Sequence, residues 1–118
     1  MRTTSERKEK SGREVPRKPI MLIDQLTTLW DEHLKAEFPS DCLGQEIQGV
    51  ELVLLDTDVA GCISTYLGSK GKLDAQGLAI LRSCYRDLAV VLPLLQPEAA
   101  AYFQRIDQMV SCVLGSVG

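Results

Sequence analysis

The stretch Ile47–Leu67, IQGVELVLLDTDVAGCISTYL, is the most apolar part of the 118-residue chain and decides its predicted fold. As a helix it would carry aliphatic side chains in almost every direction, so we expect neighbouring segments to enclose it. Gly61 lies inside this helix, where glycine costs about 1 kcal/mol relative to alanine. We expect this glycine to allow close approach of a neighbouring helix.

Three further segments repeat apolar residues at steps of three and four, which is the spacing of an amphipathic helix. These segments cover residues 19–38, 73–95 and 97–114. Pro97 suits a first helical turn, and Gly115 is expected to end the last helix. Four helices with short connecting loops predict an all-α fold, an antiparallel up-down four-helix bundle.

The first of these segments has a clear core-facing stripe and the only histidine of the chain. The stripe consists of Ile20, Ile23, Leu26, Trp30, Leu34 and Phe38. His33 lies beside it and is expected to be hydrogen-bonded or half-exposed. A metal or catalytic site is not expected there, because the chain has no second imidazole to share it.

Charge divides the chain into two parts. Residues 1–19 hold seven Lys/Arg and three Glu, a net charge of +4, whereas residues 20–118 hold six Lys/Arg and thirteen Asp/Glu, a net charge of −7. We expect residues 1–19 to be a disordered basic leader, because they are too poor in large aliphatic side chains to form a core. Residues 20–118 are expected to form the bundle. An acidic body disfavours binding of nucleic acid.

Composition and termini narrow the class of protein further. Apolar residues make up 45% of the chain and charged residues 25%, which are ordinary globular values. Acidic residues interrupt the longest apolar run, so no membrane contact is predicted. Residues 1–18 lack the apolar core of a secretion signal. The prediction is therefore a cytoplasmic protein.

The four cysteines are widely spaced and are expected to be reduced. Cys62, Cys84 and Cys112 lie in apolar stretches, where a free thiol usually behaves as a small buried hydrophobe. Cys42 lies in the polar loop PSDCLG, where a reactive thiol is the alternative. No close pair of cysteines predicts a zinc or redox motif.

One part of the central stretch allows a different interpretation. The residues VELVLLDTD at 50–58, taken as a buried strand ending in Asp-x-Asp, resemble the nucleophile motif of haloacid-dehalogenase-type phosphatases. The resemblance implies that Asp56 attacks phosphorus and Asp58 acts as general acid, with Mg²⁺ between them. It requires a strand over residues 50–56, and the rest of the chain offers no convincing second strand to pair with it.

We therefore expect a protein that works by protein–protein contact, without catalysis, cofactor or metal. The contact is either self-association as a homodimer or docking of another protein. The physical reason for expecting such contact is a surplus of apolar positions, which would leave part of Leu52, Leu55, Val59 or Tyr66 uncovered.

The alternative function is a binding module for a small apolar or anionic ligand in an interhelical pocket. Arg82 and Arg86 are four residues apart and share a helix face. Together with Tyr66 and Tyr85 they are the candidate ligand or partner contacts. Ion pairs between the two arginines and the acidic second helix are the simplest expectation for their charges.

Overall fold

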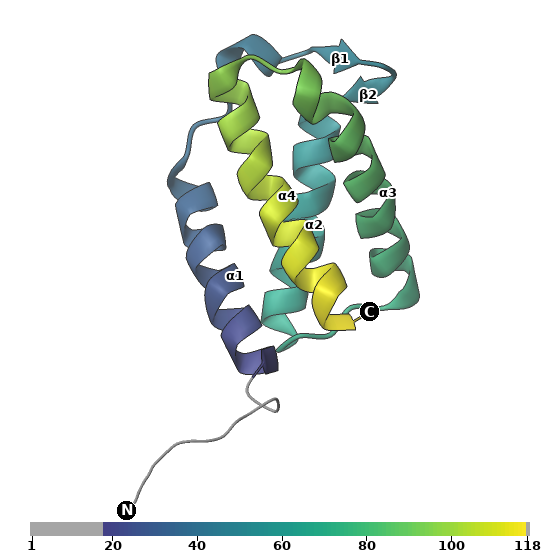
Figure 1. The fold of residues 1–118 in the computed structure, drawn as a ribbon. Helices are drawn as coiled ribbons and strands as arrows, with labels where there is room; N and C mark the ends of the chain where they lie inside the picture. Colours follow the sequence, from purple (N-terminus) through teal and green to yellow (C-terminus); the bar gives the residue numbers. More distant parts are fainter. Residues whose placement is uncertain (1–17, 118) are drawn as a thin grey trace, which may run out of the picture.

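The computed structural model describes residues 18–117, which form four α-helices and one two-stranded sheet (Figure 1). The predicted all-α class is confirmed. Of the predicted basic leader, only Lys18 and Pro19 belong to the described residues, and both lie in the first helix. The rest of that prediction lies outside the described residues.

The four helices are long and follow one another with short connections. Helix α1 spans Lys18–Lys35, α2 spans Leu52–Gly68, α3 spans Ala75–Val91 and α4 spans Pro97–Val117. Single turns of 3₁₀-helix, η2 at Ser40–Cys42 and η3 at Leu92–Leu94, precede β1 and α4 respectively. Consecutive helices run in opposite directions (Figure 1), as in an up-down bundle.

The second helix begins five residues later than predicted, because a hairpin precedes it. Strands β1, Glu46–Ile47, and β2, Val50–Glu51, pair antiparallel. Gln48 and Gly49 join them with φ angles of 52° and 80°, the left-handed conformation of a two-residue hairpin turn. The Glu51 carboxylate then accepts a hydrogen bond from the Leu54 N–H at 3.1 Å and caps α2.

Helix α4, rather than α2, is the central element of the core. It packs against α1, α2 and α3, whereas α1 has few contacts with α2 (Figure 1). The prediction that the 47–67 stretch is enclosed on all sides is therefore wrong, since α2 has a face open to solvent. The residues predicted to remain uncovered are buried, at 0% to 4% exposure: Leu52, Leu55, Val59 and Tyr66.

The buried stripe of α1 is also rotated from its predicted position. Leu26 is buried as predicted, but Leu34 is 63% exposed and His33 is only 8% exposed. A histidine takes a core position here because a partner on α2 satisfies one of its ring nitrogens, which removes most of the penalty of burying a polar group.

Candidate functional site

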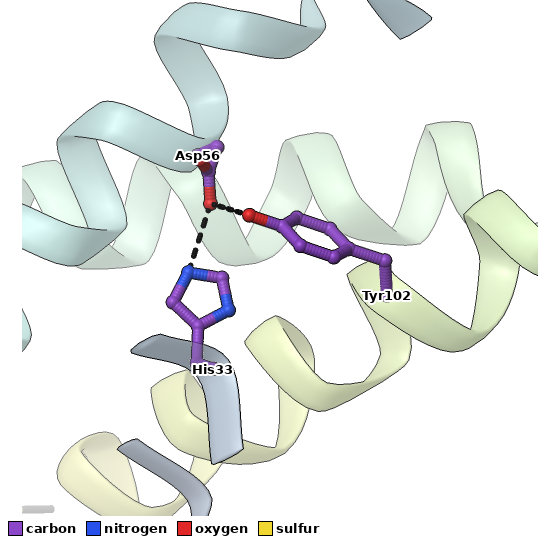
Figure 2. A network of polar contacts seen from close by, with 3 residues as sticks. All are labelled: His33, Asp56 and Tyr102. Atoms are coloured by element: carbon purple, nitrogen blue, oxygen red, sulfur yellow. Dashed lines mark hydrogen bonds and ion pairs between the residues drawn. The ribbon is translucent and has the colours of Figure 1, made fainter. Parts of the chain in front are cut away.

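A polar network joins three helices inside the bundle. His33 comes from α1, Asp56 from α2 and Tyr102 from α4, and Figure 2 shows their polar ends converging. Atom Oδ1 of Asp56 lies 3.1 Å from Nε2 of His33 and accepts a hydrogen bond from the Tyr102 hydroxyl, also at 3.1 Å. One carboxylate oxygen therefore holds groups from two other helices.

The network is enclosed mainly by aromatic rings. The ring of His33 lies 5.9 Å from that of Trp30 and 5.0 Å from that of Tyr102, between centroids. The side chains of His33 and Asp56 are 7% and 20% exposed. Burial, and then the nearby Asp56 carboxylate, raise the pKa of Tyr102, so its hydroxyl stays protonated and donates.

The second ring nitrogen of His33, Nδ1, is buried without a hydrogen-bond partner among the described residues. Because Nε2 faces a carboxylate oxygen, a hydrogen on Nε2 is donated to this contact. None of the three network residues lines any of the three cavities described below. The arrangement is therefore suited to tying helices together.

Sequence reasoning placed His33 beside the core but missed its partners. A usable signal was present, because Asp56 lies at helical spacing from the buried residues Leu52, Val59 and Ile63. An acid that shares a helix face with core residues needs a hydrogen-bond donor. What the pattern does not show is which of several donors on other helices reaches it.

A groove runs between α2 and α3 on the open face of α2. Two adjoining hollows of about 310 and 430 Å³ make up this groove and share Asp58 and Ile80 in their linings. Leu54 of α2 is 58% exposed and Ile80 of α3 is 37% exposed, and both side chains line the groove. Two large apolar side chains on neighbouring helices thus face solvent together. We call this feature the α2–α3 groove.

The lining of the α2–α3 groove is acidic. Its charged residues are Glu51, Asp58, Asp74 and Asp87, and no lysine or arginine is among its lining residues. Within the part of the chain that the structure describes, none of the four acids forms an ion pair. The expected pairing of Glu51 or Asp58 with an arginine is not seen there, so the groove combines exposed apolar surface with negative charge.

Gly61 lies on the floor of the groove. A Cβ atom added at this position would meet no atom of the described chain within 4 Å. The prediction that Gly61 allows close helix approach is therefore wrong. The buried Gly77 of α3 does contact α2, because its carbonyl oxygen lies 3.7 Å from Sγ of Cys62. A Cβ atom added at Gly77 would lie 2.7 Å from Cγ of Leu73, in the loop that precedes α3.

The four residues predicted to contact a ligand or partner lie in different environments. Tyr66 is 4% exposed, and its hydroxyl lies 2.7 Å from Oγ of Ser116 on α4. Tyr85 is 45% exposed on α3, and Arg82 and Arg86 are exposed on the same helix. The structure brings Arg82, Tyr85 and Arg86 onto one surface and separates Tyr66 from them. Between described residues, neither arginine forms the expected ion pair with α2.

The two acids of the phosphatase-like motif lie in a helix. Residues 52–56 belong to the first turns of α2, so the strand that the motif requires is not formed. The carboxylate of Asp56 is engaged by His33 and Tyr102, whereas Asp58 is exposed in the α2–α3 groove. The two carboxylates therefore face different surroundings and do not share a cation site.

All four cysteines are free thiols, and three are buried: Cys42, Cys62 and Cys84. Cys42 is 1% exposed, and burial together with the neighbouring Asp41 raises its pKa, which disfavours the nucleophilic thiolate. Burial and nearby acids raise the pKa of Cys84 to about 12. Among the described residues, no group of three or more His, Cys, Asp or Glu is arranged to hold a metal ion.

A separate cavity of about 440 Å³ lies at the end of the bundle where α4 begins. Its walls come from residues 39–42 with Gln45 and Ile47 on one side, and from residues 94–99 on the other. The lining includes the acids Asp41 and Glu98 and no basic residue. This volume lies within the range of small-molecule sites.

Comparison of the chain with protein-family models, with curated proteins and with solved structures gave no match. None of the helices in residues 18–117 combines the length and apolar character needed to cross a membrane.

Proposed function

We propose that this protein works by non-catalytic contact with another protein, and that the α2–α3 groove is the contact surface. The observation that carries the proposal is the joint exposure of Leu54 and Ile80 on neighbouring helices that line one groove. Exposed apolar residues that share a concave surface are typical of protein-binding sites, whereas isolated ones are common on any surface.

The charge of the groove favours a different protein over a second copy of this chain. If two copies met groove to groove, acids such as Asp58 and Asp87 would be brought toward their own counterparts. Like charges brought together at an interface oppose association. A partner with complementary charge has no such penalty, so docking of another protein is supported better than self-association.

Site-specific photo-crosslinking in cells tests the contact function. A photoreactive amino acid replaces Leu54 in the full chain, and the control carries it at Leu34, which is equally exposed on α1. We expect a discrete adduct of higher mass from position 54 only. Adducts that are equal at both positions, or absent at position 54, would count against the groove as the contact surface.

Light scattering on size-exclusion chromatography separates the two kinds of partner. We expect the full chain to remain monomeric over a wide range of concentration, because the acidic groove opposes self-association. A stable dimer that Leu54→Asp dissociates and Leu34→Asp does not would make self-association the function.

The ligand-binding alternative rests on a single feature, the cavity of about 440 Å³ at the start of α4. Tyr66, Arg82, Tyr85 and Arg86 do not line it. A screen of small ligands by amide chemical shifts tests this alternative, and shifts confined to Cys42, Gln45 and Ala99 would support it.

A further inference from the structure

Three features of the α2–α3 groove bear on its occupant. It has apolar side chains at its centre, acidic side chains along its length, and a helical glycine on its floor. We infer that its occupant is a basic amphipathic α-helix of a partner protein. This inference rests on the proposed contact function and adds the chemistry of the partner.

The shape of the groove argues for a helix as the occupant. The two hollows extend from Glu51, at the start of α2, to Thr65 in its last turns, so they follow most of the helix. A surface between two antiparallel helices offers parallel ridges, against which a third helix packs with its own ridges. A partner helix of about five turns would match the 17 residues of α2.

The positions of the apolar residues specify an amphipathic occupant. Leu54 and Ile80 both line the hollow nearer the start of α2, with Leu55 and Cys84 beneath them. A partner helix that presents leucine-like side chains at steps of three and four would cover these residues. Burial of such side chains against the groove supplies the apolar part of the contact.

The acids specify basic residues on the flanks of that helix. Asp58 lies midway along the groove, and Asp87 lies beside the hollow that contains Leu54. Lysine or arginine residues on the partner would approach these carboxylates while their aliphatic stems cover the apolar centre. An acidic or neutral helix would leave the carboxylates without compensation.

The missing side chain at Gly61 also favours a helix as the occupant. In the free protein this glycine makes no contact that requires the absence of a side chain, although glycine lowers helix stability. A bare backbone on the floor of the groove allows a partner helix to approach closely. Docking thus gives this residue a physical role that intramolecular packing does not give it.

Defined peptides test the inference on the full chain. The probe is a helical peptide of about 18 residues, with leucines on one face and lysines on the other. Two matched peptides replace either the lysines by glutamate or the leucines by glutamine. In titration calorimetry, we expect only the peptide that carries both leucines and lysines to bind. Its affinity should fall as salt rises, because salt screens the charge contacts.

Variants of the protein locate the binding site. A Cβ atom at position 61 meets no described atom within 4 Å, and Gly61→Leu should reduce binding at least about tenfold by filling the groove. Leu54→Ala should reduce binding about tenfold through lost apolar contact, and Asp58→Asn about threefold through lost charge. The matched controls are Gly115→Leu, at another glycine with open space around its Cβ position, and Leu34→Ala.

The outcomes separate failure of this inference from failure of the contact function. If the glutamine peptide binds as tightly as the leucine–lysine peptide, the basic amphipathic helix is overturned as occupant. The same holds if the Gly61→Leu variant binds that peptide as tightly as the unsubstituted protein does. A homodimer dissociated by Gly61→Leu would also overturn it, while keeping contact as the function.

A synthetic peptide of residues 1–17 is the last probe. Groove-dependent binding tighter than that of the designed peptide would make this chain's own segment the occupant and overturn an external partner.

Discussion

His33, Asp56 and Tyr102 show how one oxygen atom can set the relative positions of three helices. Two donors meet Oδ1 of Asp56, and each comes from a different helix. Because His33 and Tyr102 are buried, water cannot replace the carboxylate without reorganisation of the packed rings around it. The network therefore selects one arrangement of α1 against α2 and α4.

Removal of the Asp56 carboxylate is expected to destabilise the protein. Asp56→Ala leaves the Nε2–H group of His33 and the hydroxyl of Tyr102 without their acceptor, which should cost about 1–3 kcal/mol. Urea unfolding monitored by circular dichroism measures this change. The control is Asp58→Ala, which alters an exposed carboxylate two residues away and should change stability by less than about 0.5 kcal/mol. Equal effects of the two variants would show that the network adds no stability.

Gly61 of α2 and Gly77 of α3 should respond to alanine in opposite ways. Gly61→Ala adds a methyl group in open space and should raise stability by about 0.5–1 kcal/mol, the helix-propensity gain over glycine. Gly77→Ala places its Cβ 2.7 Å from Cγ of Leu73, so that side chain must move and the gain is lost or reversed. Thermal unfolding of both variants checks this contrast. A loss of stability in Gly61→Ala would contradict the open surroundings of that residue.

At the scale of elements, the β1–β2 hairpin determines where α2 begins. Its two turn residues reverse the chain at Gln48 and Gly49, and β2 then delivers Glu51 to the capping position. Sequence periodicity cannot reveal this arrangement, because Ile47 and Val50 also fit the spacing of a helix face.

Substitution at Gly49 tests the importance of the turn. The φ angle of 80° is unfavourable for residues with a Cβ atom, so Gly49→Ala should cost about 1–2 kcal/mol even though no described atom lies within 4 Å of the new methyl group. Asparagine tolerates the left-handed region better than alanine. Gly49→Asn should therefore retain more of the stability, as measured by urea unfolding. Indistinguishable alanine and asparagine variants would indicate that the turn conformation is not the cause.

At the scale of the whole molecule, α4 connects the two halves of the bundle. It contacts α1 on one side and α2 and α3 on the other, while α1 contributes little to the α2 surface (Figure 1). Several of its residues are fully buried, among them Phe103, Ile106 and Met109. Helices α2, α3 and α4 therefore all contact one another, whereas α1 is attached mainly through α4.

Hydrogen exchange should follow this arrangement. We expect amides of α4 to exchange last and amides of α1 to exchange earlier, because segments with fewer tertiary contacts open at lower free energy. Exchange measured by NMR or mass spectrometry on the full chain checks the order. Asp56→Ala should accelerate exchange in α1 more than in α3, since the network attaches α1. Slower exchange in α1 than in α4 would contradict the described packing.

The all-α class and the number of helices followed from the amino-acid pattern alone. Apolar residues at steps of three and four identify helices because each turn of a helix places them on one side, whatever surrounds the helix. The proline signal also placed the start of α4 at Pro97 correctly, whereas the prediction that Gly115 ends this helix is wrong, because α4 continues to Val117. These features depend on local conformational preferences, which the local sequence contains.

Contacts between residues far apart in the chain decided which side chains each helix buries and which it exposes. No local pattern distinguishes Leu54, which is exposed, from Leu55, which is buried one residue later in an entirely apolar stretch. The same limit applies to His33, whose burial requires an acceptor 23 positions away in the chain. Residues on separate helices meet only when the helices pack, so the polar network and the α2–α3 groove could be identified only from the assembled bundle.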